Sequence, residues 1–267
     1  MQNYFHIGRF VIPMYYSFHT RYQGWTGMMA WLIKYLIPVL SMAYAQADFD
    51  FSRFVVGSLF FYVIYEVGYI QNDCETIKKE ASPTLRLKAD ELAFYESHKI
   101  LIYLTRLAEL LLLGYALTKM GVGMAILLYG TLTLLIFAWY NTIRNGFCLV
   151  VHLILMMLRY TFPVFAASNH FSVEVAWVAL ILYPLTLFIE RSVKGKFEYK
   201  SQWLARFVMH NYDERYLFRL RYYSVLLVAI GIWILCDWSR AAYGFPVLLL
   251  WATSLMNYRS EKYRYKH

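Results

Sequence analysis

The stretch YEVGYIQNDCETIKKE, residues 65–80, decides how this chain is interpreted. An almost unbroken apolar segment runs into Asn72 and Asp73 and then into a group of carboxylates and lysines. Carboxylates at the edge of a membrane are costly unless they bind something. A spanning helix that ends here would present them to a metal ion held against the phosphates of a membrane lipid. The stretch therefore predicts a membrane span that ends in a polar site.

The composition of the whole chain also indicates an integral membrane protein. Of its 267 residues, 60% are hydrophobic and 16% are charged, whereas soluble domains have roughly 45–50% apolar and about 25% charged residues. The first residues show no basic region followed by a cleavage site, as a cleavable signal peptide would. We therefore expect the spans themselves to direct insertion into the membrane. Cys74, Cys148 and Cys236 lie far apart without a CxxC pair, which indicates neither a disulfide framework nor a zinc site.

Apolar segments of membrane-spanning length recur along the whole chain. A spanning helix needs roughly 20 apolar residues, and the segments predict an all-α, polytopic transmembrane helical bundle of about eight spans, a single domain over residues 1–267. Two connections, 72–98 and 190–221, are long, and the others are short enough to make sequence neighbours antiparallel. The predicted spans are residues 28–46, 54–71, 99–118, 120–140, 146–166, 173–189, 222–238 and 241–257.

The distribution of basic residues predicts the orientation of this bundle. With eight spans both termini share one side, which collects most of the 26 lysines and arginines, while the other side keeps Arg53, Lys119 and Arg240. Cytoplasmic loops carry the excess of Lys and Arg, so both termini and both long loops are predicted to be cytoplasmic, in a bacterial inner membrane. The charge of +9 then serves topology and attraction to anionic lipid, or forms a phosphate-binding vestibule. Nucleic acid is not an expected partner, because no soluble module carries a basic groove.

The first long loop contains the acidic candidates for the site. Four oxygen-bearing side chains share one face of a helix that continues past residue 72, namely Asn72, Asp73, Thr76 and Glu80. Such a face suits Mg²⁺, which takes one or two carboxylates and leaves its other positions to water and phosphate. Glu66 lies two turns before Asp73, on the same face and inside the membrane. The alternative is a solvated helix end whose mixed charges simply face water.

Basic and aromatic side chains near these carboxylates are candidate phosphate ligands. Lys78 belongs to the same stretch, and Arg86 follows a Ser-Pro-Thr break, where a guanidinium group can bind phosphate through two hydrogen bonds. Tyr140 and Arg144 lie four residues apart at the end of the fourth predicted span and so face the same way. For this pair the alternative is an aromatic-belt tyrosine beside an interfacial arginine.

The second long loop is basic at its start and amphipathic further on. It opens with Glu190, and Lys194 and Lys196 follow on either side of a glycine. Apolar and aromatic residues then recur at helical spacing over residues 203–220 among arginines, which predicts an amphipathic helix on the membrane surface. That helix is either an interfacial anchor or a lid over a cytoplasmic site to which the two lysines donate.

With these motifs the chain resembles the UbiA superfamily of intramembrane prenyltransferases. That family is an all-helical bundle with an NDxxDxxxD motif between spans two and three, a YxxxK element near the end of span four, and a second acidic motif between spans six and seven. Asn72, Asp73 and Glu80 match the first motif in place and spacing. Tyr140 and Arg144 match the YxxxK element, with Arg in place of Lys.

The resemblance implies a transferase that acts on a polyprenyl phosphate or diphosphate at the cytoplasmic face. Asp73 and Glu80 would bind Mg²⁺, which neutralises a departing diphosphate, and Asn72 would orient these ligands. Tyr69 would line the prenyl tunnel or steady a carbocation. The implied substrate-binding residues are Glu66, Tyr69, Lys78, Arg86, Tyr140, Arg144, Lys194 and Lys196.

The departures from the family pattern keep two other functions open. Thr76 stands in place of the middle acidic residue of the first motif, and Lys194 follows Glu190 where the second motif has a further carboxylate. One branch of the superfamily transfers phosphoribose from phosphoribosyl diphosphate to polyprenyl phosphate, and its H-P-T-K stretch is loosely similar to Ser82-Pro83-Thr84 with Arg86. Phosphoribosyl transfer is therefore the alternative among enzymes, and a non-catalytic transporter or scaffold is the alternative outside them.

Overall fold

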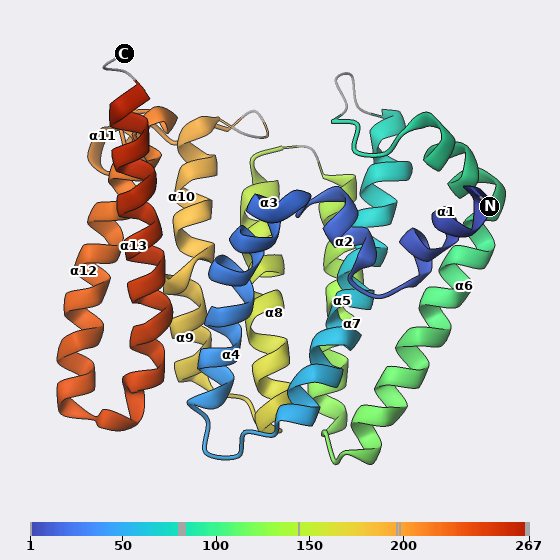
Figure 1. Cartoon of the computed structure of the whole chain (residues 1–267), viewed down its shortest axis with the longest axis horizontal. Coiled ribbons are helices and arrows are strands. Elements are labelled where there is room, and N and C mark those ends of the chain that lie inside the picture. Colours follow the sequence, from blue (N-terminus) through green and yellow to red (C-terminus); the bar gives the residue numbers. More distant parts are fainter. Residues whose placement is uncertain (1, 80–83, 144, 196, 198, 265–267) are drawn as a thin grey trace. The chain divides into compact units, whose positions relative to one another are not determined.

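Figure 1 shows a computed structural model of the chain, which describes residues 2–79, 84–143, 145–195, 197 and 199–264. Among these residues every regular element is a helix, which confirms the all-α prediction. Contacts divide the chain into two compact units. Unit 1 consists of Met1–Trp31, Asp50–Ile143 and Phe162–Phe171, and unit 2 consists of Leu32–Phe49, Arg144–Thr161 and Ser172–His267.

Six of the described helices are long and apolar enough to cross a membrane: Gly24–Tyr44, Phe51–Lys79, Ala89–Lys119, Met124–Thr142, Phe147–Ser168 and Tyr212–Cys236. The bent pair Val173–Leu182 and Pro184–Lys194 adds a seventh if its two parts, at 43° to each other, form one span. The last predicted span, residues 241–257, lies in helix α13 (Ala241–Arg264), which is not among these candidates. The helices are thus consistent with a polytopic membrane protein, and the count of eight stays a prediction.

Unit 1 contains α1 (Gln2–Val11), α2 (Tyr15–Thr20), α3 (Gly24–Trp31), α5 (Phe51–Cys74), a 3-10 turn η2 (Thr76–Lys79), α6 (Ala89–Lys119) and α7 (Met124–Thr142). The central helix is α5, which packs against both α6 and α7. It begins after Asp50, whose carboxylate accepts from the Arg53 N–H at 2.8 Å. Gly68 lets α7 come close, because a Cβ there would lie 2.3 Å from the Phe137 ring.

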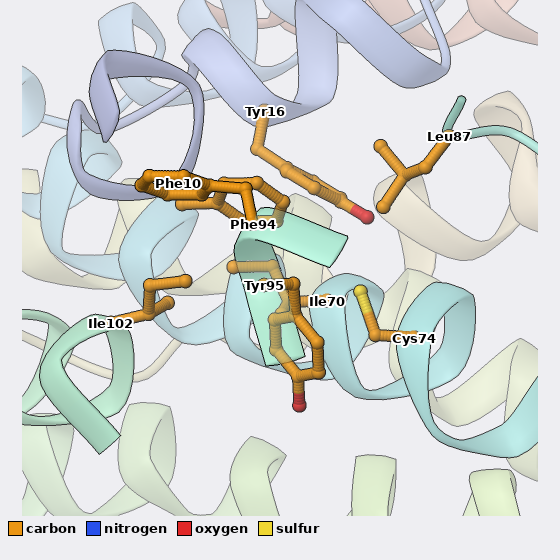
Figure 2. Packing of buried hydrophobic residues seen from close by; sticks show 8 residues of the cluster. All are labelled: Phe10, Tyr16, Ile70, Cys74, Leu87, Phe94, Tyr95 and Ile102. Carbon is orange, nitrogen blue, oxygen red and sulfur yellow. The ribbon is translucent and has the colours of Figure 1, made fainter. Parts of the chain in front are cut away.

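The N-terminal segment belongs to the core of unit 1. Figure 2 shows Phe10 and Tyr16 packed among side chains of α5 and α6, with the Phe10 ring stacked 6.0 Å from that of Phe94. The cluster comprises Phe10, Tyr16, Ile70, Cys74, Leu87, Phe94, Tyr95 and Ile102. The segment that precedes the first span is therefore held against the end of α5 that carries Asp73.

The end of α5 differs from the sequence prediction. The α-helix ends at Cys74, and residues Thr76–Lys79 form a 3-10 turn, so the prediction of one helix continuing through residue 80 is wrong. The physical reason lies at Glu75, the C-cap residue, whose carboxylate accepts from Tyr95 at 2.8 Å and from Lys99. Both partners belong to α6, and they draw the chain away from the helix axis.

Unit 2 contains a π-helix η1 (Leu32–Leu36), α4 (Ile37–Tyr44), most of α8 (Phe147–Ser168), α9 (Val173–Leu182), α10 (Pro184–Lys194), α11 (Gln202–Phe207), 3-10 turns η4 (Tyr212–Glu214) and η5 (Trp238–Arg240), α12 (Arg215–Cys236) and α13. Helices α12 and α13 lie side by side (Figure 1). The predicted amphipathic helix over 203–220 is interrupted after Phe207. Asn211 starts a new turn there, because its side-chain oxygen accepts from the N–H groups of Asp213 and Glu214.

Candidate functional site

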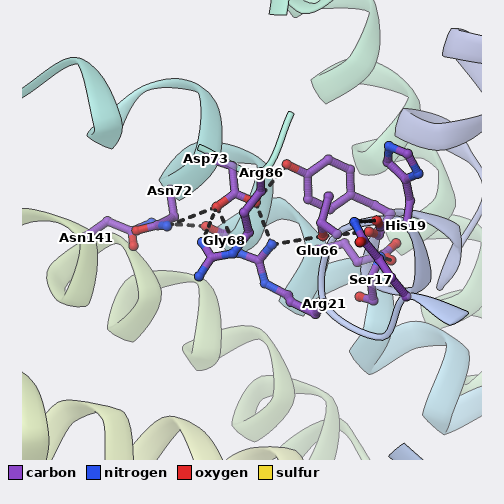
Figure 3. A network of polar contacts seen from close by, with 12 residues as sticks. Ser17, His19, Arg21, Glu66, Gly68, Asn72, Asp73, Arg86 and Asn141 are labelled. Carbon is purple, nitrogen blue, oxygen red and sulfur yellow. Dashed lines mark hydrogen bonds and ion pairs between the residues drawn. The ribbon is translucent and has the colours of Figure 1, made fainter. Parts of the chain in front are cut away.

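The candidate site of unit 1 is centred on Asp73 in the last turn of α5, where the side chain is almost fully buried (Figure 3). Arg21 donates to both carboxylate oxygens, from Nη1 at 2.6 Å and from Nη2 at 2.9 Å. Arg86 donates to Oδ1 at 2.9 Å. The Tyr16 hydroxyl and the Asn72 amide add bonds of 3.0 and 3.1 Å. We call these five residues the Asp73 cluster.

The Asp73 cluster contains two guanidinium groups for one carboxylate. Arg21 is held in place by the Tyr69 ring, with its Cζ 3.9 Å from the ring centroid. Burial and the neighbouring charge of Asp73 raise the pKa of Tyr16 well above its ordinary value, so this hydroxyl stays a neutral donor. The cluster is therefore a fixed arrangement of donors that carries more positive than negative charge.

Glu66 ties the N-terminal segment to the middle of α5. Its fully buried carboxylate accepts from the backbone N–H groups of Ser17 at 2.7 Å and Met14 at 3.0 Å, and from Arg106 at 2.8 Å. Met14 adopts a left-handed conformation with φ of 71°, uncommon for a residue with a side chain. Arg106 also donates to Glu109 at 2.9 Å. The described contacts of Glu66 are thus with the protein itself, and its role as a substrate-binding residue stays a prediction.

The N-terminal segment supplies further hydrogen-bond donors to unit 1. Glu91, at the start of α6, is buried and accepts from Arg9 and, at 2.8 Å, from His19. The sequence analysis counted Arg9 and Arg21 among the basic residues of the predicted cytoplasmic side and singled out neither as a site residue. Nothing in their local pattern shows that they meet carboxylates of α5 and α6, so this part of the site was missed.

Asn141 is a second residue that sequence reasoning missed, next to the predicted Tyr140. Its side-chain amide donates to the Gly68 carbonyl at 3.1 Å and to Gln71 Oε1 at 3.0 Å, which joins α7 to the last turns of α5 (Figure 3). Its own Oδ1 is buried and accepts no hydrogen bond from the residues that the structure describes. Tyr140 is half-buried and packs on the Phe137 ring at 6.2 Å.

The structure brings only some of the predicted residues together. Asn72, Asp73 and Arg86 share the cluster and Tyr69 packs on its Arg21, whereas Lys78 donates to Glu75 and Glu96. Lys194 belongs to unit 2, where it is exposed and lies 4.6 Å from the Tyr212 ring centroid. Three predicted residues, Glu80, Arg144 and Lys196, lie outside the described residues.

The donor set around Asp73 does not fit a resident magnesium ion. Each carboxylate oxygen already accepts from a guanidinium group, whose charge repels a second cation. No three His, Cys, Asp or Glu side chains among the described residues are grouped so as to hold a metal. Since the other predicted ligand, Glu80, is not described, magnesium binding stays a prediction, and no step proposed below passes through the metal.

Comparisons with known proteins were made at three levels. No protein-family model matches the chain, no curated protein matches it, and no solved structure matches it. The resemblance to the UbiA superfamily therefore stays an expectation, drawn from the motifs at residues 72–80 and 140–144 and from the pattern of predicted spans.

Proposed function

We propose that this chain is an integral membrane transferase that holds a polyprenyl phosphate or diphosphate at the Asp73 cluster, on the cytoplasmic side of a bacterial inner membrane. The observation that carries the proposal is the convergence of Arg21 and Arg86 on one buried carboxylate at the end of a candidate span. Both termini and both long loops would lie on that same side, as the distribution of basic residues predicts.

Arg86 is the best placed phosphate ligand of the cluster. Its side chain is 33% exposed, and only Nη1 is used by Asp73. Nε and Nη2 donate to no described residue, so they can bind two oxygens of one phosphate. Asp73 would orient the guanidinium group. Arg21, whose side chain is only 14% exposed, would add positive charge from the buried side of the cluster.

The chemistry proposed for the cluster is electrostatic. In prenyl transfer the bond between the prenyl carbon and the diphosphate oxygen breaks, and the electron pair stays on the diphosphate. Fixed guanidinium groups stabilise that developing charge without having to reorganise. The lipid tail would lie along the aromatic side chains of α5 and α7, where the Tyr65, Tyr69 and Phe137 rings contact one another at 4.7–5.8 Å.

Phosphoribosyl transfer to a polyprenyl phosphate is the second candidate. It is favoured by the hydrogen bonds that both oxygens of Asp73 already accept from arginines. In that reaction the lipid phosphate attacks, and diphosphate leaves from the sugar donor. A lipid phosphate that arrives without a chelated metal needs cationic donors more than carboxylates. The two arginines of the cluster provide such donors, while their bonds to Asp73 hold its oxygens away from a metal.

The test is product analysis on the purified protein. It would be supplied with a polyprenyl diphosphate plus aromatic acceptors, or with a polyprenyl phosphate plus phosphoribosyl diphosphate, each with Mg²⁺ and with EDTA. Mass detection of a prenylated or a phosphoribosylated product separates the two reactions, and EDTA tests the magnesium prediction. Absence of product under every condition would favour the transporter or scaffold.

Arg86→Gln provides the residue-level test of the proposed site. Loss of a charge-assisted hydrogen bond costs about 1.5–3 kcal/mol, so we expect kcat/KM to fall roughly ten- to hundredfold. Arg240→Gln is the matched control, because that side chain is 29% exposed and also pairs with carboxylates, Glu174 and Asp237. Equal activity in the two variants would remove Arg86 from the site.

A further inference from the structure

Lys34 lies in the π-helix of unit 2, inside a candidate span. The helix widens here because Pro38 has no N–H to donate to the Lys34 carbonyl four residues earlier. The Tyr160 hydroxyl of α8 donates to this carbonyl instead. Single π-helical turns within α-helices often mark functional sites, and this one carries a lysine in the middle of the span.

Arg159 occupies the matching position in α8. Pro163 lies four residues after it, within the same helix, and the Tyr35 hydroxyl donates to the Arg159 carbonyl at 3.4 Å. The Tyr35 ring also lies 4.2 Å from the Arg159 Cζ. In each helix, a carbonyl that a proline leaves without its usual donor thus accepts from a tyrosine hydroxyl of the other helix. Each of these two carbonyls belongs to a basic residue, Lys34 or Arg159.

The ring of Tyr183 is the next element of this arrangement. Tyr183 lies at the break between α9 and α10, where the two helices bend by 43°. The carbonyls of Ile181 and Leu182 accept from the hydroxyls of Tyr222 at 2.7 Å and Tyr223 at 2.8 Å. These bonds fix the break, and irregular backbone at membrane depth is tolerated where it is satisfied in this way.

Two cations meet the Tyr183 ring. Lys34 Nζ lies 5.8 Å from its centroid, and Arg219 Cζ lies 5.9 Å from it. Arg219 donates through Nε and Nη2 to Glu190, the second of these bonds being 2.7 Å. Its Nη1 donates to no described residue, and no described carboxylate pairs with Lys34.

Lys34 therefore lacks the counter-charge that charged groups inside membrane spans usually have. A contact with an aromatic ring recovers only part of the cost of an ammonium group at that depth. An anion bound beside the Tyr183 ring would supply acceptor oxygens to the ammonium group of Lys34, and Arg219 Nη1 is a further donor at the same ring.

From this arrangement we infer that Lys34 and Arg219 bind a phosphate-class anion beside Tyr183. The anion is either the head group of a lipid or a free phosphate, since both present the same oxygens to an ammonium and a guanidinium group. The inference rests on residues of unit 2 alone and holds whether or not the Asp73 cluster is a transferase site.

Thermal unfolding of the full-length protein tests this site with two probes. In phosphatidylcholine vesicles, the melting temperature would be measured on titration with inorganic phosphate, and separately on addition of phosphatidic acid. We expect one probe to raise the melting temperature of the wild type, which identifies the source of the anion. Lys34→Gln should weaken the apparent affinity for that probe at least tenfold, and Lys34→Arg should retain most of it.

The controls separate this site from the basic surface and from the proposed function. Lys119 also lies over a tyrosine ring, 5.3 Å from that of Tyr115, but it is exposed at the end of α6. Lys119→Gln should therefore respond to the probe as the wild type does, and Lys34→Gln should weaken the response in an Arg86→Gln background as it does in the wild type. No response of the wild type to either probe would overturn the inference. It would equally be overturned if Lys34→Gln responded like Lys119→Gln, or if Lys34→Gln had no effect in the Arg86→Gln background.

Discussion

Asp73 in unit 1 and Glu190 in unit 2 are both buried carboxylates in motif positions, yet they hold their cations differently. Asp73 accepts from two guanidinium groups, a phenol and an amide. Glu190 accepts from Arg219 alone among the described residues, and Lys34 near the same arginine has no carboxylate. Both sites hold more cations than carboxylates, but Asp73 binds both of its arginines directly, whereas Glu190 binds Arg219 and no described carboxylate pairs with Lys34.

The difference shows that a motif position does not fix the role of a carboxylate. The partners of Asp73 decide it, and Arg21 lies 52 residues away in the chain. A carboxylate that binds two arginines becomes an organiser of donors for an anion, whereas the same residue among other carboxylates would bind a cation. Each site is thus defined by the balance of charges around it.

Labelling of native cysteines would test the largest assumption in this comparison, that both carboxylates lie near the cytoplasmic face. Cys236 is exposed at the end of α12, on the predicted outer side, whereas Cys74 and Cys148 are buried. A membrane-impermeant maleimide applied to intact spheroplasts should therefore label the wild type and should not label Cys236→Ser. Labelling of Cys236 only after permeabilisation would contradict the predicted topology and the cytoplasmic location of the two carboxylates.

Much of the fold could be predicted from the sequence, because the apolar segments are long and polar connections separate them. The end of α5 could not, since it depends on Tyr95 and Lys99 of α6 binding Glu75. Nor could the bend at Tyr183 be located, because a proline inside an apolar run can begin a new helix or kink an existing one.

The candidate site was predictable only in part, for a similar reason. Asn72, Asp73 and Arg86 stand close in sequence, and their polarity at the end of a span identifies them. Tyr16 and Arg21 reach the site through the folding of the N-terminal segment against α5 and α6, which no local pattern encodes. Lone basic residues at a membrane surface usually determine topology, and this general expectation gave no reason to place the N-terminal segment at the site.

Stability measurements on Asp73→Asn and Glu190→Gln would sharpen the contrast between the two sites. Asp73→Asn leaves two guanidinium groups without their carboxylate, so we expect the free energy of unfolding in detergent to fall by about 3–5 kcal/mol. Glu190→Gln frees one guanidinium group, which keeps its ring contact with Tyr183, and should cost about 1.5–3 kcal/mol.

Glu174→Gln is the control for this pair of variants. Glu174 also binds an arginine, Arg240, but its side chain is 26% exposed, and exposed ion pairs contribute about 0–1 kcal/mol. If Asp73→Asn lowered the free energy of unfolding no more than Glu174→Gln does, the positions of the two arginines would not depend on Asp73.

The smallest effect is expected at Asp50, the carboxylate that opens α5 at the end opposite to Asp73. Asp50→Ala removes the N-cap bond to the Arg53 N–H and should cost about 1 kcal/mol, whereas Asp50→Asn should cost little. The Arg53 N–H holds the pKa of Asp50 below its ordinary value. The charged cap therefore stabilises the fold above the unfolded pKa of about 3.9, and this contribution is lost as pH falls through the lower folded value. Melting curves at pH 7 and pH 3 should show the gap between wild type and Asp50→Ala narrowing in acid. A gap that stayed constant would mean that the side chain caps α5 without any contribution from its charge.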